Sequence, residues 1–209
     1  MRRLSLARAG TVMTLALLVA GASACSTSVT RMSPDQAMDL SGRWNDVDSR
    51  LVADALIEQS FAQVNGANWV TRHARARGGE RPALIVGTVR NRSMEHIPVN
   101  TFVRDLERAF VQSGQVRVVA RSDEREEVRD ERYDQQQHAA ADSRARLGRE
   151  LGASYILQGE IQSIEDREGR RRVVFYQIDL NLVNLETNER SWVGQHKIKK
   201  YVQQPRLRI

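Results

Sequence analysis

The 209 residues of this chain include one cysteine, Cys25. A disulfide within the chain is therefore excluded, even in a compartment that would permit one. Long apolar runs are also missing, since the longest stretch, residues 11–20, is too short to span a bilayer as a stable helix. We expect the fold to be stabilised by the packing of apolar side chains alone.

The sequence also lacks the motifs that carry catalysis. Its four histidines, His73, His96, His138 and His196, form no i, i+4 pair and have no second cysteine with which to build a metal site. No G-x-S-x-G elbow and no phosphate-binding glycine loop is present. Acidic residues are dense over 123–131, but interspersed arginines make a solvated helix with local ion pairs the simpler interpretation. We expect no enzyme, no cofactor and no metal.

The first 24 residues have the three parts of a secretory signal. The basic start contains Arg2, Arg3 and Arg8. An apolar run covers residues 11–20, and small residues at 21–24 precede Cys25. A cysteine at this place accepts a diacylglyceryl group in lipoprotein processing. Ordinary secretion is the alternative, because Ala22-Ser23-Ala24 is also a cleavage signal. We expect lipidation, since a free thiol at the mature terminus of an exported protein is otherwise hard to explain.

Removal of the signal leaves 185 residues, which is enough for one domain with a real core. The formal charge falls from +6 to +3 without the three signal arginines. Such a mild excess is no evidence for nucleic-acid binding, although the pI is about 10.1. We expect neither a nucleic-acid partner nor a small-molecule substrate.

The mature chain divides into three parts. Residues 25–41 are small and polar with one proline, Pro34, and predict a lipidated N-terminus and short tether. The domain is expected over residues 42–203, and residues 204–209 are a C-terminal tail. The 17 residues from Cys25 to Gly42 reach at most roughly 60 Å, so the tether keeps the domain close to its membrane.

Apolar periodicity predicts several helices. The first covers residues 45–64, with Trp44, Val47, Leu51 and Ala55 on its apolar face and two aspartates in its first turn. The second follows Pro98 and ends at Gly114, with an apolar face listed as Val99, Phe102, Val103, Leu106 and Phe110. A third helix, capped by Ser122, runs to Arg132 before a glutamine-rich interruption, and a fourth covers residues 141–151 and stops at Gly152. Residues 72–82 are expected to form a basic loop.

Strands are expected at residues 83–89, 116–120, 155–164, 173–185 and 191–201. In the fourth of these, Val174, Tyr176, Ile178, Leu180 and Leu182 alternate with polar residues, which is the period of a half-buried strand. Asn188 suits the turn before the last strand because asparagine tolerates a left-handed conformation. This order predicts an α/β fold, a sheet flanked by helices with an antiparallel C-terminal meander.

Four segments resemble the LpoB-type lipoprotein activators of class A penicillin-binding proteins. They are residues 42–46 (Gly-Arg-Trp-Asn-Asp), 89–93 (Val-Arg-Asn-Arg-Ser), 151–159 (Leu-Gly-Ala-Ser-Tyr-Ile-Leu-Gln-Gly) and 185–192 (Leu-Glu-Thr-Asn-Glu-Arg-Ser-Trp). The resemblance covers roughly residues 42–203 and implies a fold similar to the N-terminal domain of TolB. It also implies an outer-membrane lipoprotein on the periplasmic side that binds and stimulates a class A penicillin-binding protein, a peptidoglycan synthase.

The short tether departs from activators whose long proline-rich tether crosses the periplasm. Either the synthase extends towards this protein, or the lipoprotein serves a partner near the outer membrane. The second possibility has its own resemblance, because residues 152–160 and 186–189 are also similar to the curli secretion lipoprotein family. That family needs extra membrane-spanning strands, and this chain has no additional paired segments of the right length and alternation. An accessory role in secretion or envelope assembly is the alternative function.

Four side chains are candidates for partner binding. Asn91 and Arg92 match the family's loop after the first strand, where a polar side chain can instead cap the next element. Lys197 and Lys199 share one face of the last strand beside Gln195, although lysines on an edge strand commonly prevent unwanted pairing. Trp192 is expected to pack in the core, and residues 170–172 to form a solvated turn.

The lipid anchor gives the first testable prediction. Wild-type protein expressed in its host should incorporate labelled palmitate and fractionate with the outer membrane, because Ser26 is not the aspartate that retains lipoproteins in the inner membrane. Cys25→Ala should yield an unlabelled periplasmic form. Wild-type protein that takes up no palmitate would contradict the assignment.

Overall fold

The computed structural model describes residues 29–33, 36–140, 142–143, 145 and 150–203. The expected signal, Cys25 and the tail 204–209 lie outside these residues. Contacts divide the chain into Met1–Gln36 and a compact unit, Ala37–Ile209, which contains all the elements described below. Within the described part of the chain, no helix has both the length and the apolar character needed to cross a membrane.

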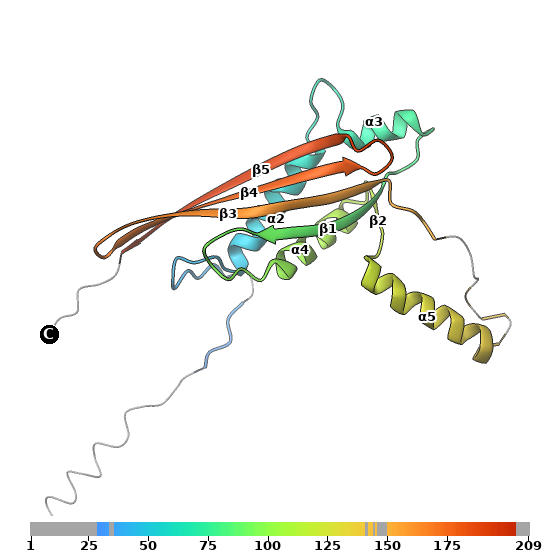
Figure 1. The fold of residues 1–209 in the computed structure, drawn as a ribbon, viewed down its shortest axis with the longest axis horizontal. Helices are drawn as coiled ribbons and strands as arrows, with labels where there is room; N and C mark the ends of the chain where they lie inside the picture. The colour runs from blue at the N-terminus through green and yellow to red at the C-terminus, as the bar shows by residue number, and fades with distance from the viewer. Residues whose placement is uncertain (1–28, 34–35, 141, 144, 146–149, 204–209) are drawn as a thin grey trace, which may run out of the picture. The chain divides into compact units, whose positions relative to one another are not determined.

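A five-stranded sheet forms the centre of the compact unit (Figure 1). Its strands, in the order β2-β1-β3-β4-β5, are β1 (Ala83–Asn91), β2 (Arg117–Val118), β3 (Tyr155–Glu168), β4 (Arg171–Asn184) and β5 (Arg190–Gln203). β1 lies parallel to β2 and β3, whereas β3, β4 and β5 are antiparallel. The predicted α/β class with an antiparallel C-terminal meander is confirmed.

Helices α2 (Asp46–Phe61) and α4 (Val99–Ser113) pack on one face of this sheet, which we call the inner face. The alternation predicted in β4 is confirmed, because all five of its apolar residues at even positions from Val174 to Leu182 are at most 1% exposed. The predicted stripe of α4 is also confirmed, since Phe102, Leu106 and Phe110 are buried. Gly114 ends this helix at φ 64°, a left-handed conformation that glycine adopts without strain.

The predicted apolar face of α2 was wrong. Leu51 is 58% exposed, whereas the helix buries a neighbouring stripe that contains Val52, Leu56 and Ile57. Apolar residues occur around most of the helix, so their spacing did not decide which stripe faces the sheet. Its start lies within one residue of the predicted one, since Asn45 is the N-cap of the helix and accepts a hydrogen bond from the Asp48 backbone. Its end at Phe61 comes before the predicted end at Val64.

Two other helical predictions need correction. Residues 72–76 of the expected loop belong to α3 (Trp69–Ala76), which begins where the side chains of Asn68 and Thr71 each accept a hydrogen bond from the other's backbone N–H. Helix α5 (Ser122–His138) includes Ser122 as its first residue instead of being capped by it. It also continues through the glutamines that were expected to interrupt it, because glutamine is a good helix former.

Two further segments differ in extent. The strand expected at residues 116–120 is reduced to the two residues of β2, followed by a bond from the Val119 N–H to the Leu84 carbonyl. Most of the helix expected at 141–151 lies outside the described residues, and residues 142–143 form a turn. The turn at Asn188 is confirmed by its φ of 61°.

The packing of Trp192 explains a glycine in β5. A Cβ added to Gly194 would lie 2.1 Å from the Trp192 ring, so this glycine makes room for the indole on the inner face. Trp192 is partly buried and packs against the core, as expected.

The α4 stripe gives the second testable prediction. Leu106 is fully buried, so Leu106→Ala should lower the free energy of unfolding by about 2–5 kcal/mol through lost burial and a residual cavity. The matched control, Leu51→Ala, removes the same atoms from an exposed position and should cost under about 1 kcal/mol. Urea unfolding followed by circular dichroism measures both. Equal losses in the two variants would contradict this packing.

Candidate functional site

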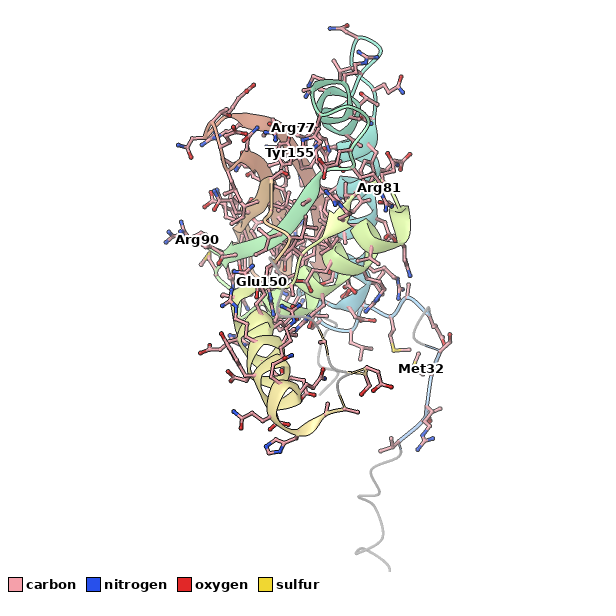
Figure 2. All side chains as sticks on the ribbon, turned by 90° about the vertical axis from the view of Figure 1, so that its right-hand side faces the viewer. Met32, Arg77, Arg81, Arg90, Glu150 and Tyr155 are labelled. Carbon is pink, nitrogen blue, oxygen red and sulfur yellow. The ribbon has the colours of Figure 1, made fainter. Side chains whose placement is uncertain are left out.

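The opposite surface of strands β3, β4 and β5, which we call the outer face, is not covered by α2 or α4. The register places every second residue of these strands on it, from Ile156 in β3, Val173 in β4 and Val193 in β5. None of these outward residues is buried. Figure 2 shows Arg90 of β1 pointing away from α2 and α4. The sheet therefore presents one packed face and one open face.

Two of the predicted partner-binding residues lie together on the outer face. Lys197 pairs with Gln177 and Lys199 with Phe175 in the β4–β5 ladder, and both lysines are exposed. Gln195 precedes them on the same face, as expected. β5 is the edge strand of the sheet, so the two lysines line an open edge as well as an open face.

Apolar side chains adjoin the two lysines. Ile164 of β3 lies directly opposite Phe175 of β4, and Val173 of β4 lies opposite Tyr201 of β5. We call these four residues the apolar strip. Ile164 is 67% and Tyr201 60% exposed, which is unusual for large apolar side chains that adjoin one another. Exposed apolar surface with a polar rim is typical of protein interaction sites.

Asn91 organises the loop that follows β1. Its side chain donates to the Glu95 carbonyl at 2.7 Å and accepts from the Ser93 backbone N–H at 2.9 Å. Since both ends of the amide are engaged within the loop, its visible role is to shape the segment that carries Arg92.

Arg92 follows β1, so it lies three strands away from the two lysines of β5 on the same outer face. Its backbone N–H donates to the Ile161 carbonyl at 2.8 Å, and its side chain is exposed. Asn91 pairs with Ile161, so the next residue, Arg92, lies beside Gln162. Gln162 pairs with Gln177, and Gln177 pairs with Lys197, so Arg92 and Lys197 lie in one row across the sheet. Three strand spacings, about 14 Å, separate the two positions. The structure therefore brings Lys197 and Lys199 together and places Arg92 across the same face.

Lys200, one residue beyond Lys199, points to the inner face. Its ammonium donates to Asp48 at 2.6 Å, to Asp39 at 2.7 Å and to the Arg43 carbonyl at 3.0 Å. Its side chain is 12% exposed. Burial alone would lower the pKa of Lys200, but the hydrogen bonds to Asp39 and Asp48 outweigh it, and the pKa is raised. The bond from Lys200 also lowers the pKa of Asp39.

A second polar contact joins the loop after β1 to the core. The carboxylate of Glu95 accepts from the Tyr176 hydroxyl at 2.8 Å and from the Trp44 backbone at 3.2 Å. The Trp44 indole meets the Tyr176 ring edge-on, with 5.6 Å between the centroids. Burial, followed by the bond to Glu95, raises the pKa of Tyr176. The loop beside the outer face is thus attached to the core.

A hollow of about 530 Å³ lies between α3, the start of β3 and the β4–β5 turn. There His73 Nδ1 lies 3.1 Å from the Tyr155 hydroxyl, and Arg77 pairs with Glu186. Burial lowers the pKa of His73. Figure 2 shows Arg77 close to Tyr155. Across the described ranges, no three residues of the kinds that bind metals are grouped to hold an ion.

Sequence reasoning identified the two exposed lysines but missed the apolar strip and Lys200. The two-residue period that placed Lys197 and Lys199 on one face also puts Lys200 on the other, so this signal was available. The apolar strip needed the register between strands, because Ile164 and Tyr201 are far apart in the sequence.

Comparisons with known proteins found one matching family model and several solved structures that are similar to this one. The family model described as peptidoglycan-synthase activator LpoB matches residues 48–198. The LpoB C-terminal domain from Salmonella enterica is 20% identical, with a TM-score of 0.38 over 75% of this chain and 99% of that chain. The corresponding domain from Escherichia coli is 18% identical, with a TM-score of 0.41 over 73% and 99%. Lipoprotein GNA1162 from Neisseria meningitidis is 17% identical, with a TM-score of 0.36 over 57% and 83%. No curated protein matches the chain.

The opposite orientations of two neighbouring lysines give the third prediction. Lys200→Met leaves Asp48, whose side chain is 9% exposed, without its cation. It should lower the free energy of unfolding by roughly 2–4 kcal/mol. Lys199→Met, the matched control, should change it by under about 0.5 kcal/mol. Urea unfolding near neutral pH distinguishes the two, and equal effects would contradict the assigned faces.

As an extension of the third prediction, the ion pairs of Lys200 with Asp39 and Asp48 should make the free energy of unfolding depend on pH. Because the folded state raises the pKa of Lys200, its stabilisation is complete below the ordinary lysine pKa of about 10.4 and is lost as pH rises through the folded-state value. Wild-type stability should therefore fall in this alkaline range, and Lys200→Met should fall less steeply. A parallel decline in both would show that other groups cause it.

Proposed function

The chain belongs to the LpoB family of peptidoglycan-synthase activators, and from this premise we propose that it binds and stimulates a class A penicillin-binding protein through its outer face. It acts as a lipoprotein of the outer membrane, anchored at Cys25 with the domain on the periplasmic side. Its part in the reaction is that of a bound activator, and the synthase carries out the chemistry. The open outer face is the observation that carries this proposal.

The outer face has the make-up of a binding surface. The apolar strip offers area whose removal from water favours association by about 25 cal/mol for each Å² buried. Lys199 lies opposite Phe175 within it, and Lys197 lies beside it. A partner surface with apolar side chains surrounded by carboxylates fits this arrangement, because rim charges set the encounter rate and the specificity.

Arg92, at the β1 end of the outer face, supports the proposal that this face binds the synthase. The loop that carries it is shaped by Asn91 and attached to the core through Glu95. The Arg92 side chain is exposed and forms no ion pair with another described residue, so it is available to a partner. A contact that spans the row from Arg92 to Lys197 would cover most of the width of the sheet.

The short tether limits where the partner is met. With a reach of at most roughly 60 Å from Cys25 to Gly42, the domain meets only those parts of a synthase that extend towards the outer membrane. We therefore place the contact on a domain of the synthase that projects away from the inner membrane.

The fourth prediction tests the outer face. The chain from Ser26 should stimulate glycan polymerisation by a class A synthase of its own organism. Changing Lys197 and Lys199 together to serine should weaken binding by about tenfold, on the order of 1.4 kcal/mol, without altering the fold. The matched control changes Arg75 and Arg108 to serine, which removes the same charge from exposed positions on α3 and α4, away from the outer face.

Glycan synthesis and binding are measured with each protein, and urea unfolding verifies the fold. Equal weakening by both double variants would show that charge alone matters, not the outer face. Neither binding to nor stimulation of any class A synthase of the organism would overturn the activator proposal itself.

A further inference from the structure

A hollow rich in arginine lies at the far end of the β3–β4 hairpin, where the chain enters the domain. Its volume is about 530 Å³, and its lining residues are Leu40, Ser41, Arg43, Arg167, Arg170, Arg172, Val202 and Gln203. We call it the arginine pocket. Figure 1 shows that this hairpin extends past the ends of α2 and α4, so the pocket lies away from the main core.

The wall formed by residues 40–43 is held firmly against the hairpin. Arg172 donates to the Ser41 carbonyl at 2.9 Å, and Lys200 donates to the Arg43 carbonyl at 3.0 Å. Gly42, at φ 67°, approaches Val202 so closely that a Cβ would lie 2.0 Å from its methyl group. The pocket is therefore a built feature of the fold and not a gap beside a loose segment.

The charges in the arginine pocket are not balanced. Among the residues that the structure describes, Arg172 alone of the four arginines has a carboxylate within ion-pair distance, Glu165 at 3.5 Å. In the described part of the chain, Arg43, Arg167 and Arg170 have no such partner, and no acidic residue lines the pocket. Arg167 also lies directly opposite Arg172 in the ladder, and like charges in that position destabilise a sheet. A bound anion would offset this repulsion.

The chemistry of the pocket favours phosphate. Guanidinium groups present paired N–H donors that match phosphate oxygens, and they remain charged at any physiological pH. Several of them around one hollow suit a group with two or more anionic oxygens.

An exposed apolar residue beside the arginines identifies the source of that phosphate. Leu40 lines the pocket and is 89% exposed, and the nearby Met38 is 44% exposed. Apolar side chains next to cations are the composition of a surface that lies in the headgroup layer of a membrane. Leu40 and Ser41 are also the last residues of the tether expected from Cys25.

We propose that the arginine pocket and Leu40 bind the phosphate groups of anionic phospholipid headgroups and thereby hold the domain against the membrane that carries its anchor. This inference concerns a surface other than the outer face and needs no synthase. It adds a non-covalent membrane contact that sets the position of the domain at the membrane, while the diacylglyceryl group at Cys25 provides the attachment itself.

The fifth prediction tests the pocket with the unlipidated chain from Ser26 to Ile209, which contains the whole compact unit. This protein should sediment with vesicles of phosphatidylglycerol and phosphatidylethanolamine, but not with vesicles of phosphatidylcholine alone. Changing Arg43, Arg167 and Arg170 to serine should reduce binding on the order of a hundredfold, since each basic residue near an anionic membrane contributes about 1 kcal/mol. Leu40→Ser should reduce it further.

The matched control changes Arg75, Arg90 and Arg190 to serine, which removes equal charge from exposed positions outside the pocket. It should alter vesicle binding by less than about threefold. Equal losses in the two triple variants, or no binding of the wild type to anionic vesicles, would overturn the proposal. Both triples replace exposed side chains, so urea unfolding should show no loss of stability, and the pocket triple should be slightly stabilised because it removes the repulsion between Arg167 and Arg172.

Two further arms distinguish other occupants. Binding of inorganic phosphate to the wild type without lipid, measured by calorimetry and lost in the pocket triple, together with vesicle binding that the pocket triple leaves intact, would assign the pocket to a free anion and overturn the lipid source. Loss of synthase stimulation by the pocket triple in detergent, without vesicles, would assign the pocket to the synthase instead. Normal stimulation in detergent with lost vesicle binding supports the proposal, and failure of the activator proposal would leave the vesicle result unaffected.

Discussion

The partly buried ammonium of Lys200 is the contact on which both proposed binding surfaces depend. Through Asp48 it joins β5 to the start of α2, and through Asp39 and the Arg43 carbonyl it fixes the segment that enters the domain. The cation and its carboxylates are stable in this partly buried place because each has hydrogen-bonding partners. The same residue therefore aligns the strand that presents Lys197 and Lys199 and positions one wall of the arginine pocket.

The sheet depends equally on side chains that form hydrogen bonds with the backbone groups on the free edge of β5. The Gln59 amide of α2 donates to the Gln195 carbonyl and accepts from the Gln195 N–H, both at 3.2 Å. Arg72 of α3 donates to the Ser191 carbonyl. An open β-edge invites pairing with other chains, so these side chains occupy its first half. Further along β5, exposed lysines give the strand charge of one sign, which opposes pairing with an identical copy.

Helix α5 stands apart from this framework because it buries none of its residues. It is joined to its surroundings by ion pairs, among them Arg104 with Glu124 and Arg129 with Glu150. Exposed pairs of this kind contribute little stability. The two proposed binding surfaces lie on the sheet and its hairpin, whereas α5 is the element we expect to open at the lowest free-energy cost.

The sequence by itself determined the elements whose pattern has one solution. The apolar stripe of α4, the alternation of β4 and the left-handed positions Gly114 and Asn188 follow from local spacing and backbone preference, and each was predicted. The period of two in β5 likewise placed Lys197 and Lys199 on one face. These features depend on residues close together in the chain, where sequence patterns are most informative.

Only the tertiary structure decided what depends on contacts between distant segments. It selected the buried stripe of α2, because apolar residues surround most of that helix and the sheet accepts only one side. It brought Ile164, Phe175 and Tyr201 together from three strands. It also brought Arg43, which precedes α2, to the same pocket as Arg167 at the end of β3. Pairing register and the path of the entering chain set these juxtapositions, and neither leaves a periodic signal in the sequence.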